Sequence, residues 1–177
     1  VLEQKQHLTW ASHIIVMKQW FHLLMGSQQD AGLPKEASPM SVAFEQAAQA
    51  MQTTNPHATM TYYFQSMYLY YVLRDYDQMK ICADKVFEFD LHSWTLLAIH
   101  QAHSFYRGLV SFWIYRQTLD PVWAQRGQKA KLAIQKWAES ASQHNFQHKL
   151  YMLQAEEAFC NNDFVSAKSF YEQAVTA

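Results

Sequence analysis

Nine histidines are the side chains of this chain that most directly suggest metal chemistry. His144 and His148 are four residues apart, and His100 and His103 are three apart. Residues at either spacing share one face of an α-helix, so each pair could bind Zn²⁺. A closed zinc site needs four ligands, and no Cys, Asp or Glu at a suitable spacing completes either pair. We therefore predict surface or packing histidines and no metal, with a metal-binding four-helix bundle as an alternative.

The segment from Ala102 to Gly108 (AHSFYRG) resembles the phospho-accepting motif of histidine phosphotransfer domains. In that motif a basic residue and a glycine follow the histidine by three and four positions. Here Arg107 and Gly108 follow His103 by four and five. One extra residue rotates a side chain by about 100° around a helix, so Arg107 leaves the required face. No G-x-S-x-G motif or phosphate-binding glycine-rich loop is present, so we predict no enzyme activity and no cofactor.

The composition indicates which elements must position these side chains. Half of the 177 residues are hydrophobic and 15% are aromatic, which argues against disorder. Only 4 Gly and 4 Pro are present, which favours long helices over an all-β fold. The net charge of −1 gives no bulk attraction to nucleic acid or membrane, and no apolar run is long enough to span one. Cys82 and Cys160 lack metal-ligand spacing and indicate a reducing, cytoplasmic compartment.

Local signals place the helix boundaries. Asp120-Pro121 is a clear start signal, an N-cap followed by proline in the first turn. Asp77 can cap another helix in the same way. Gly108 lies inside a predicted helix, where glycine costs up to ~1 kcal/mol relative to alanine, so we expect a close contact with a neighbouring helix there. The signals together predict four helix hairpins, at about 1–54, 57–90, 93–141 and 145–177.

The last hairpin carries the clearest pattern of large and small residues. Tyr151 and Ala155 lie on one face of its first helix, and Ala167, Tyr171 and Ala174 lie on one face of its second. We expect the small residues to let the two helices approach closely, while Tyr151, Tyr171 and the turn residue Phe164 fill the space beside them. This unit resembles a tetratricopeptide repeat, whose helices carry small and large residues in this order.

Aromatic turn residues also recur along the chain. Tyr76, Trp123 and Phe164 follow one another at forty-odd residues, a longer period than the ~34 residues of a standard tetratricopeptide repeat. We therefore predict an all-α fold of stacked antiparallel helix hairpins, an irregular tetratricopeptide-like α-solenoid in one domain spanning 1–177. Because the chain begins at Val1 and stops within a helical pattern, we expect it to be a piece of a longer polypeptide.

Residues 105–159 are similar to the helical repeat region of large multidomain signalling proteins. In those proteins a kinase or nucleotide-binding ATPase module precedes tetratricopeptide-like repeats, and a sensor and histidine-kinase module often follows. This resemblance implies a connector and docking region without catalytic residues. The similar steps are Gly108-Leu109, Arg116-Gln117-Thr118, Arg126-Gly127, Lys136-Trp137-Ala138, Asn145-Phe146 and Ala155-Glu156.

The tetratricopeptide resemblance also implies a binding surface, because the first helix of each pair lines the concave side of such an array. Rigid aromatic side chains there suit peptide recognition, although the aromatic residues can equally be core. We predict a non-catalytic interaction and signal-relay module whose partner is a protein or peptide segment or a neighbouring domain. The alternative is a small-molecule sensor whose aromatic core encloses a ligand. The predicted peptide-binding groove consists of Phe64, Tyr68, Tyr71, Lys149, Met152, Glu156 and Phe159.

Overall fold

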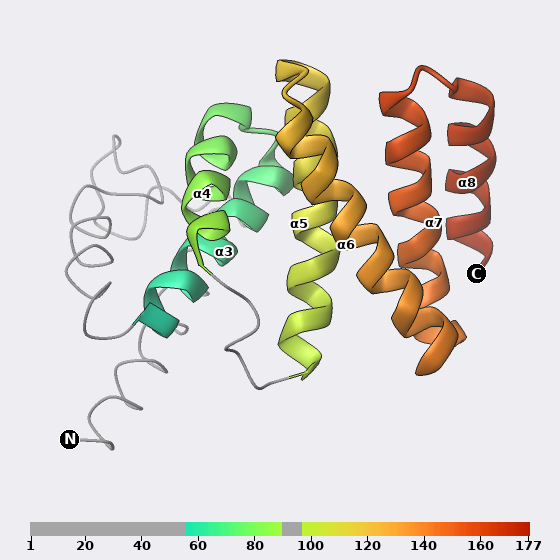
Figure 1. The fold of residues 1–177 in the computed structure, drawn as a ribbon, viewed down its shortest axis with the longest axis horizontal. Helices are drawn as coiled ribbons and strands as arrows, with labels where there is room; N and C mark the ends of the chain where they lie inside the picture. The colour runs from blue at the N-terminus through green and yellow to red at the C-terminus, as the bar shows by residue number, and fades with distance from the viewer. Residues whose placement is uncertain (1–55, 90–96) are drawn as a thin grey trace, which may run out of the picture. The chain divides into compact units, whose positions relative to one another are not determined.

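The computed structural model describes residues 56–89 and 97–177 of the chain (Figure 1). These residues form six α-helices, α3 to α8, and contain no β-strand. The prediction of an all-α fold is therefore confirmed for this part of the chain. The chain divides after Phe89 into two compact units. The hairpin predicted at about 1–54 lies outside the described residues.

The first unit contributes α3 (Pro56–Leu73) and α4 (Tyr76–Glu88), which pack against each other. Helix α3 contains most of the aromatic stretch, and Tyr62, Tyr63 and Tyr70 are buried there. Helix α4 is amphipathic, because its buried residues recur at helical spacing on one side. These residues are Met79, Cys82, Ala83 and Val86.

The N-cap of α4 is Asp75, whose side chain accepts a hydrogen bond of 3.2 Å from the backbone nitrogen of Gln78. The prediction that Asp77 caps this helix is therefore wrong, since Asp77 already lies in the first turn. Asp75 is the cap because of the residue before it. Arg74 adopts a left-handed conformation with φ 61° and turns the chain sharply. Asp75 then has the extended backbone that an N-cap requires.

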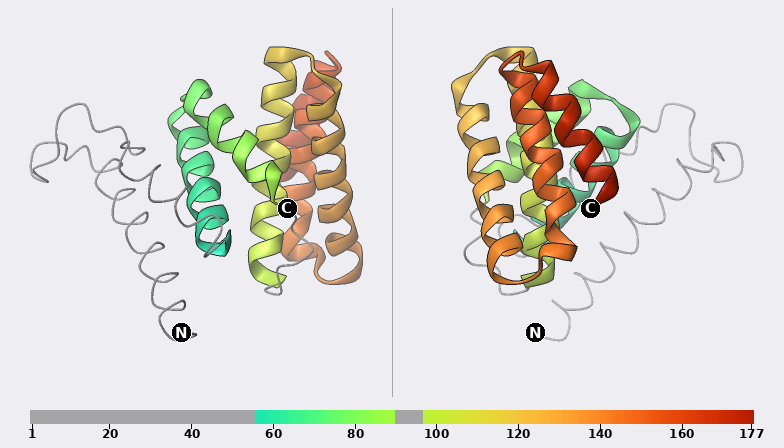
Figure 2. Two further views of the ribbon diagram at one scale, coloured as in Figure 1. Left: turned by 60° about the vertical axis from the view of Figure 1, so that its left-hand side comes forward. Right: turned by 90° about the vertical axis from the view of Figure 1, so that its right-hand side faces the viewer.

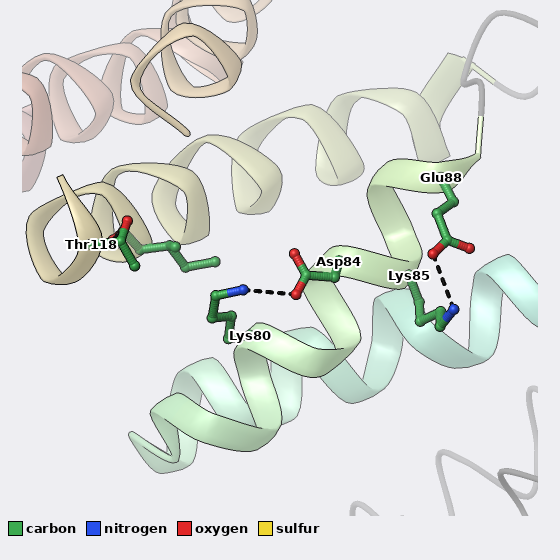
Figure 3. Close-up of polar contacts among 6 residues, drawn as sticks. Lys80, Asp84, Lys85, Glu88 and Thr118 are labelled. Atoms are coloured by element: carbon green, nitrogen blue, oxygen red, sulfur yellow. Dashed lines mark hydrogen bonds and ion pairs between the residues drawn. The ribbon is translucent and has the colours of Figure 1, made fainter. Parts of the chain in front are cut away.

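The exposed side of α4 carries two ion pairs between successive turns (Figure 3). Lys80 Nζ lies 2.8 Å from Asp84 Oδ2, and Lys85 Nζ lies 3.0 Å from Glu88 Oε1. Exposed pairs at this spacing contribute roughly 0.2–0.5 kcal/mol each to helix stability. They support α4 locally and do not decide the fold.

The described part of the second unit consists of four helices, which run antiparallel in succession (Figures 1 and 2). Helix α7 packs against α5, α6 and α8, and α5 also packs against α6. The α5–α6 and α7–α8 turns lie at one end of this unit and the α6–α7 turn at the other. The helices are α5 (Leu97–Thr118), α6 (Pro121–Ser140), α7 (Gln143–Cys160) and α8 (Phe164–Thr176).

Two glycines allow these helices to approach closely. A Cβ atom added to Gly108 of α5 would lie 2.7 Å from Leu153 Cδ2 of α7 and 3.1 Å from Ala130 Cβ of α6. A Cβ atom added to Gly127 of α6 would lie 2.7–2.9 Å from three ring atoms of Phe112. The close contact predicted for Gly108 is therefore confirmed, and it joins α5 to both α6 and α7.

A similar turn connects the two helices of each pair. A residue with positive φ follows the last helical residue directly after α3 and α5, and follows one intervening residue, Asn161, after α7. Backbone N–H groups of these turns satisfy carbonyls at the helix ends. An aspartate comes next and caps the following helix by accepting a backbone N–H. The aspartates are 45 and 43 residues apart. The pairs of turn residues are Arg74-Asp75, Leu119-Asp120 and Asn162-Asp163.

The last helix pair follows the predicted pattern only for its small residues. Ala155 and Ala167 are buried, as the close approach of α7 and α8 requires. Phe164 and Tyr171 were expected to fill the space beside them, but they are 56% and 37% exposed. The expectation is wrong for these two aromatics because α8 packs chiefly against α7, so its outward side remains in solvent. Tyr151 stacks on Phe170 of α8 with ring centroids 6.4 Å apart.

Candidate functional site

Two adjacent carboxylates near the end of α7 connect it to all three of its neighbours. Glu156 forms an ion pair with Arg116 of α5 and accepts a 2.6 Å hydrogen bond from the hydroxyl of Tyr171 in α8. Glu157 forms an ion pair with Lys131 of α6 and accepts a hydrogen bond from Gln128 of the same helix. Both acids are half-buried, so these contacts hold the α7 surface in a fixed arrangement.

Arg116 links this polar cluster to exposed aromatic rings. Its guanidinium carbon lies 5.0 Å from the ring centroid of Phe159, and Phe159 packs edge-to-face on Phe164 at 5.2 Å. Burial works against the charge of Arg116, but the charge and hydrogen bond of Glu156, together with Cys160, outweigh burial and raise the pKa of Arg116. The guanidinium is thus fully charged and contacts both a carboxylate and an aromatic face, where cation–π attraction adds to the ion pair.

The thiol of Cys160 lies against this cluster. Its Sγ atom donates to the backbone oxygen of Phe112 at 3.5 Å and lies 3.9 Å from Nη1 of Arg116. Burial raises the pKa of Cys160 above its ordinary value, although the Arg116 charge opposes this. The thiol is therefore protonated at neutral pH, whereas a nucleophilic cysteine acts as the thiolate. Cys160 fits a packing role.

The structure places the four groove residues predicted on α7 along one stripe of that helix. Lys149 Nζ lies 5.1 Å from the ring centroid of Phe146, and Met152 is half-buried. Glu156 is held by Arg116 and Tyr171, so its charge is compensated within the protein. Phe159 is 42% exposed. The stripe thus offers a cation, a thioether and an aromatic ring, while Glu156 acts as an internal support.

The groove residues predicted on α3 belong to the other compact unit. Phe64 is only 8% exposed, so it is mainly a core residue. Tyr68 and Tyr71 are half-buried, and the guanidinium carbon of Arg74 lies 5.4 Å from the ring centroid of Tyr71. Of the three, Tyr68 and Tyr71 offer surface that a partner can contact, and their binding role stays a prediction.

The histidines do not converge with other ligands in the described part of the chain. His103 is 5% exposed, which hides its ring from the active site of any phosphate donor. His144 is exposed, and His148 is half-buried with a pKa lowered by burial and by the charge of Lys149. Within residues 56–89 and 97–177, no three His, Cys, Asp or Glu side chains lie close enough together to hold a metal ion.

A second feature escaped the sequence reasoning, a polar pocket beside the turn between α6 and α7. Gln143, Gln147 and Gln154 of α7 face Gln135 and Glu139 of α6 around a volume of about 580 Å³. The spacing of the three α7 glutamines indicates a shared polar surface, because positions 143, 147 and 154 lie on one helix face. It was not recognised because glutamine on a helix usually marks an ordinary solvated surface. We call this feature the glutamine pocket.

No family model, curated protein or solved structure matches the chain. None of the described helices is long and apolar enough to cross a membrane.

Proposed function

We propose that the chain is a non-catalytic protein-interaction module, an irregular tetratricopeptide-like α-solenoid that relays signals within a larger cytoplasmic protein. The observation that carries this proposal is the contact pattern of α5 to α8. Helix α7 packs against both members of the preceding pair, α5 and α6, and then against its own partner α8. Stacked repeats have this arrangement, because the first helix of each new pair packs onto the pair before it.

The repeated turn supports the same proposal. In each described pair, a residue with positive φ is followed directly by a capping aspartate. The aspartates recur at a nearly constant interval of 43–45 residues, as the repeated unit that we propose requires. Units of this kind use the same local geometry to present successive helices side by side, which builds an extended surface for a partner.

The docking face that we propose is the stripe of Lys149, Met152 and Phe159 on α7. Phe159 supplies exposed aromatic area and Lys149 supplies a positive charge, a combination that suits an extended or helical peptide with an apolar and an acidic residue. Glu156 takes no direct part, since Arg116 and Tyr171 already engage it. Its role is to fix α5, α7 and α8 so that the stripe is rigid before the partner arrives.

The test is selection of a random peptide library on the immobilised chain, followed by calorimetric titration of the enriched peptides. We expect the double variant Lys149→Ala plus Phe159→Ala to weaken binding by about tenfold or more, because truncating central anchor residues removes most of an interface's affinity. Circular dichroism of each variant verifies that the helices are intact.

The matched control is Lys129→Ala plus Leu132→Ala, which removes one exposed lysine and one exposed large apolar residue from α6. Peptide binding should be unchanged in this variant. A second variant, Tyr68→Ala plus Tyr71→Ala, tests the predicted groove residues of α3 independently. Full affinity in the Lys149/Phe159 variant would refute docking on α7, and failure to enrich any peptide would count against an interaction module.

A further inference from the structure

The glutamine pocket lies on the opposite side of α7 from the proposed docking face. Successive residues of a helix are rotated by about 100°, so Gln154 and Glu156 point roughly 200° apart around α7. Gln143, Gln147 and Gln154 form one wall of the pocket, and Gln135 and Glu139 of α6 form the other. The pocket is an open surface hollow rather than an enclosed cavity, and its volume of about 580 Å³ is large enough for part of a small ligand.

A single charge lines the pocket among the described residues. It belongs to Glu139, and none of the Lys, Arg or His side chains of residues 56–89 and 97–177 lines the pocket. Gln135 Nε2 donates to Glu139 Oε1 at 2.8 Å, which orients the carboxylate. A carboxylate has several acceptor sites, so this bond leaves Glu139 able to accept from a ligand. Anionic ligands such as phosphates are therefore disfavoured, and cations are attracted.

One acceptor in the pocket wall has no donor. The Oε1 atom of Gln154 is buried, and no hydrogen-bond partner lies within reach of it in the described part of the chain. Buried polar atoms are nearly always paired, so an orphan acceptor calls for an explanation. Gln154 also lines the glutamine pocket, and the terminal torsion of a glutamine is soft. A donor bound in the pocket is therefore the partner that we expect this oxygen to meet.

We propose that the glutamine pocket binds an organic cation that carries several N–H donors, a guanidinium or ammonium group. Glu139 supplies the opposite charge, and the side-chain oxygens of Gln154 and Gln147 accept the remaining donors. A guanidinium fits this arrangement best, because its planar set of five N–H groups can reach separate acceptors at once. This site does not depend on peptide docking at α7, since the two lie on different sides of the helix.

The proposal is tested with agmatine, a small guanidinium compound that also carries an ammonium group, on the full chain. Isotope-labelled protein reports binding through the side-chain amide signals of Gln143, Gln147 and Gln154. Agmatine should shift these signals in a saturable manner and bind about tenfold more tightly than 4-guanidinobutyrate, in which a carboxylate replaces the ammonium and is repelled by Glu139. Raised salt should weaken agmatine binding.

Two variants identify the groups that bind. Gln154→Leu removes the orphan acceptor, and Glu139→Gln removes the charge, and each should weaken agmatine binding by about tenfold. The controls are Gln125→Leu and Glu172→Gln, at exposed positions outside the pocket, which should leave binding unchanged. Gln154→Leu should also raise the melting temperature, because a buried unpaired acceptor is gone. Unchanged agmatine affinity in both pocket variants would overturn the proposal, whatever happens to stability.

N-acetyl-arginine amide mimics an arginine side chain in a peptide. Its affinity distinguishes an arginine side chain from a free small cation as the ligand. Equal affinity for this compound and agmatine supports recognition of an arginine side chain on a docked segment. A clear preference for agmatine supports a free small cation. If neither compound shifts the glutamine signals, or if 4-guanidinobutyrate binds as tightly as agmatine, the pocket does not select cations and the proposal fails.

Discussion

Arg116 of α5 and Glu156 of α7 are forty residues apart in the sequence and form an ion pair in the second compact unit. Their side chains are only 23% and 12% exposed, so the pair is shielded from solvent more than an ordinary surface pair. The same carboxylate accepts the Tyr171 hydroxyl of α8. One acidic residue therefore ties three helices together, next to a neighbour, Glu157, that ties in the fourth.

We expect Glu156→Ala to lower the free energy of unfolding by about 1–3 kcal/mol, because Arg116 then remains partly desolvated without its carboxylate. Urea denaturation followed by circular dichroism measures the loss. The control is Glu172→Gln, which breaks the exposed i,i+4 pair between Lys168 and Glu172 and should change stability by no more than about 0.5 kcal/mol. Equal effects of the two substitutions would show that the Arg116–Glu156 pair has no special structural role.

The glycine contacts give a second prediction. Gly127→Ala should destabilise the protein by about 1–3 kcal/mol, because the new methyl group would meet three atoms of the buried Phe112 ring. Gly108→Ala should destabilise less, since its closest neighbour is the end of the flexible Leu153 side chain. Alanine favours helix over glycine by about 1 kcal/mol, which offsets part of each loss. Thermal melts of both variants check the order, and a larger effect at Gly108 would contradict it.

The sequence was most informative where the cause of a structure is local. Asp120-Pro121 starts α6 as predicted, because an N-cap and a proline in the first turn act through their immediate neighbours. Asp75 and Asp77 were harder to distinguish, since both are good caps. The choice depends on the left-handed conformation of Arg74, which no sequence pattern marks because arginine rarely adopts it.

Features that depend on distant neighbours were not predictable in the same way. The spacing placed Phe159 and Glu156 on one stripe, but it gave no indication that Arg116 would engage both. The aromatic pattern likewise did not separate Tyr70, which is buried, from Phe164, which is mostly exposed. Burial depends on how many helices pack around an element, and that number follows from tertiary structure.

The cap of α8 gives a prediction for pH. Hydrogen bonds from the Ser166 side chain and backbone lower the pKa of Asp163 below its ordinary value. The charged carboxylate therefore stabilises the folded state above an unfolded pKa of about 3.9, and this contribution is lost as the pH falls through the lower folded pKa. Asp163→Asn keeps a capping side chain without the charge. The melting temperature of the wild type should fall more than that of Asp163→Asn on acidification below about pH 5. An equal fall in both proteins would exclude this linkage.

Leu119 is the residue at which a substitution should stabilise the protein. It has φ 56° in the turn after α5, a conformation that is strained for leucine, and its side chain is 73% exposed. Leu119→Gly should raise the free energy of unfolding by about 0.5–1 kcal/mol, because glycine adopts positive φ without a steric penalty. Asn162→Gly, in the equivalent turn after α7, should have little effect, since asparagine tolerates this conformation. Gln117→Gly, two residues earlier in the last turn of α5, should instead destabilise by up to about 1 kcal/mol. Urea melts of the three variants measure these differences, and a loss of stability in Leu119→Gly would mean that the leucine side chain makes contacts that outweigh its backbone strain.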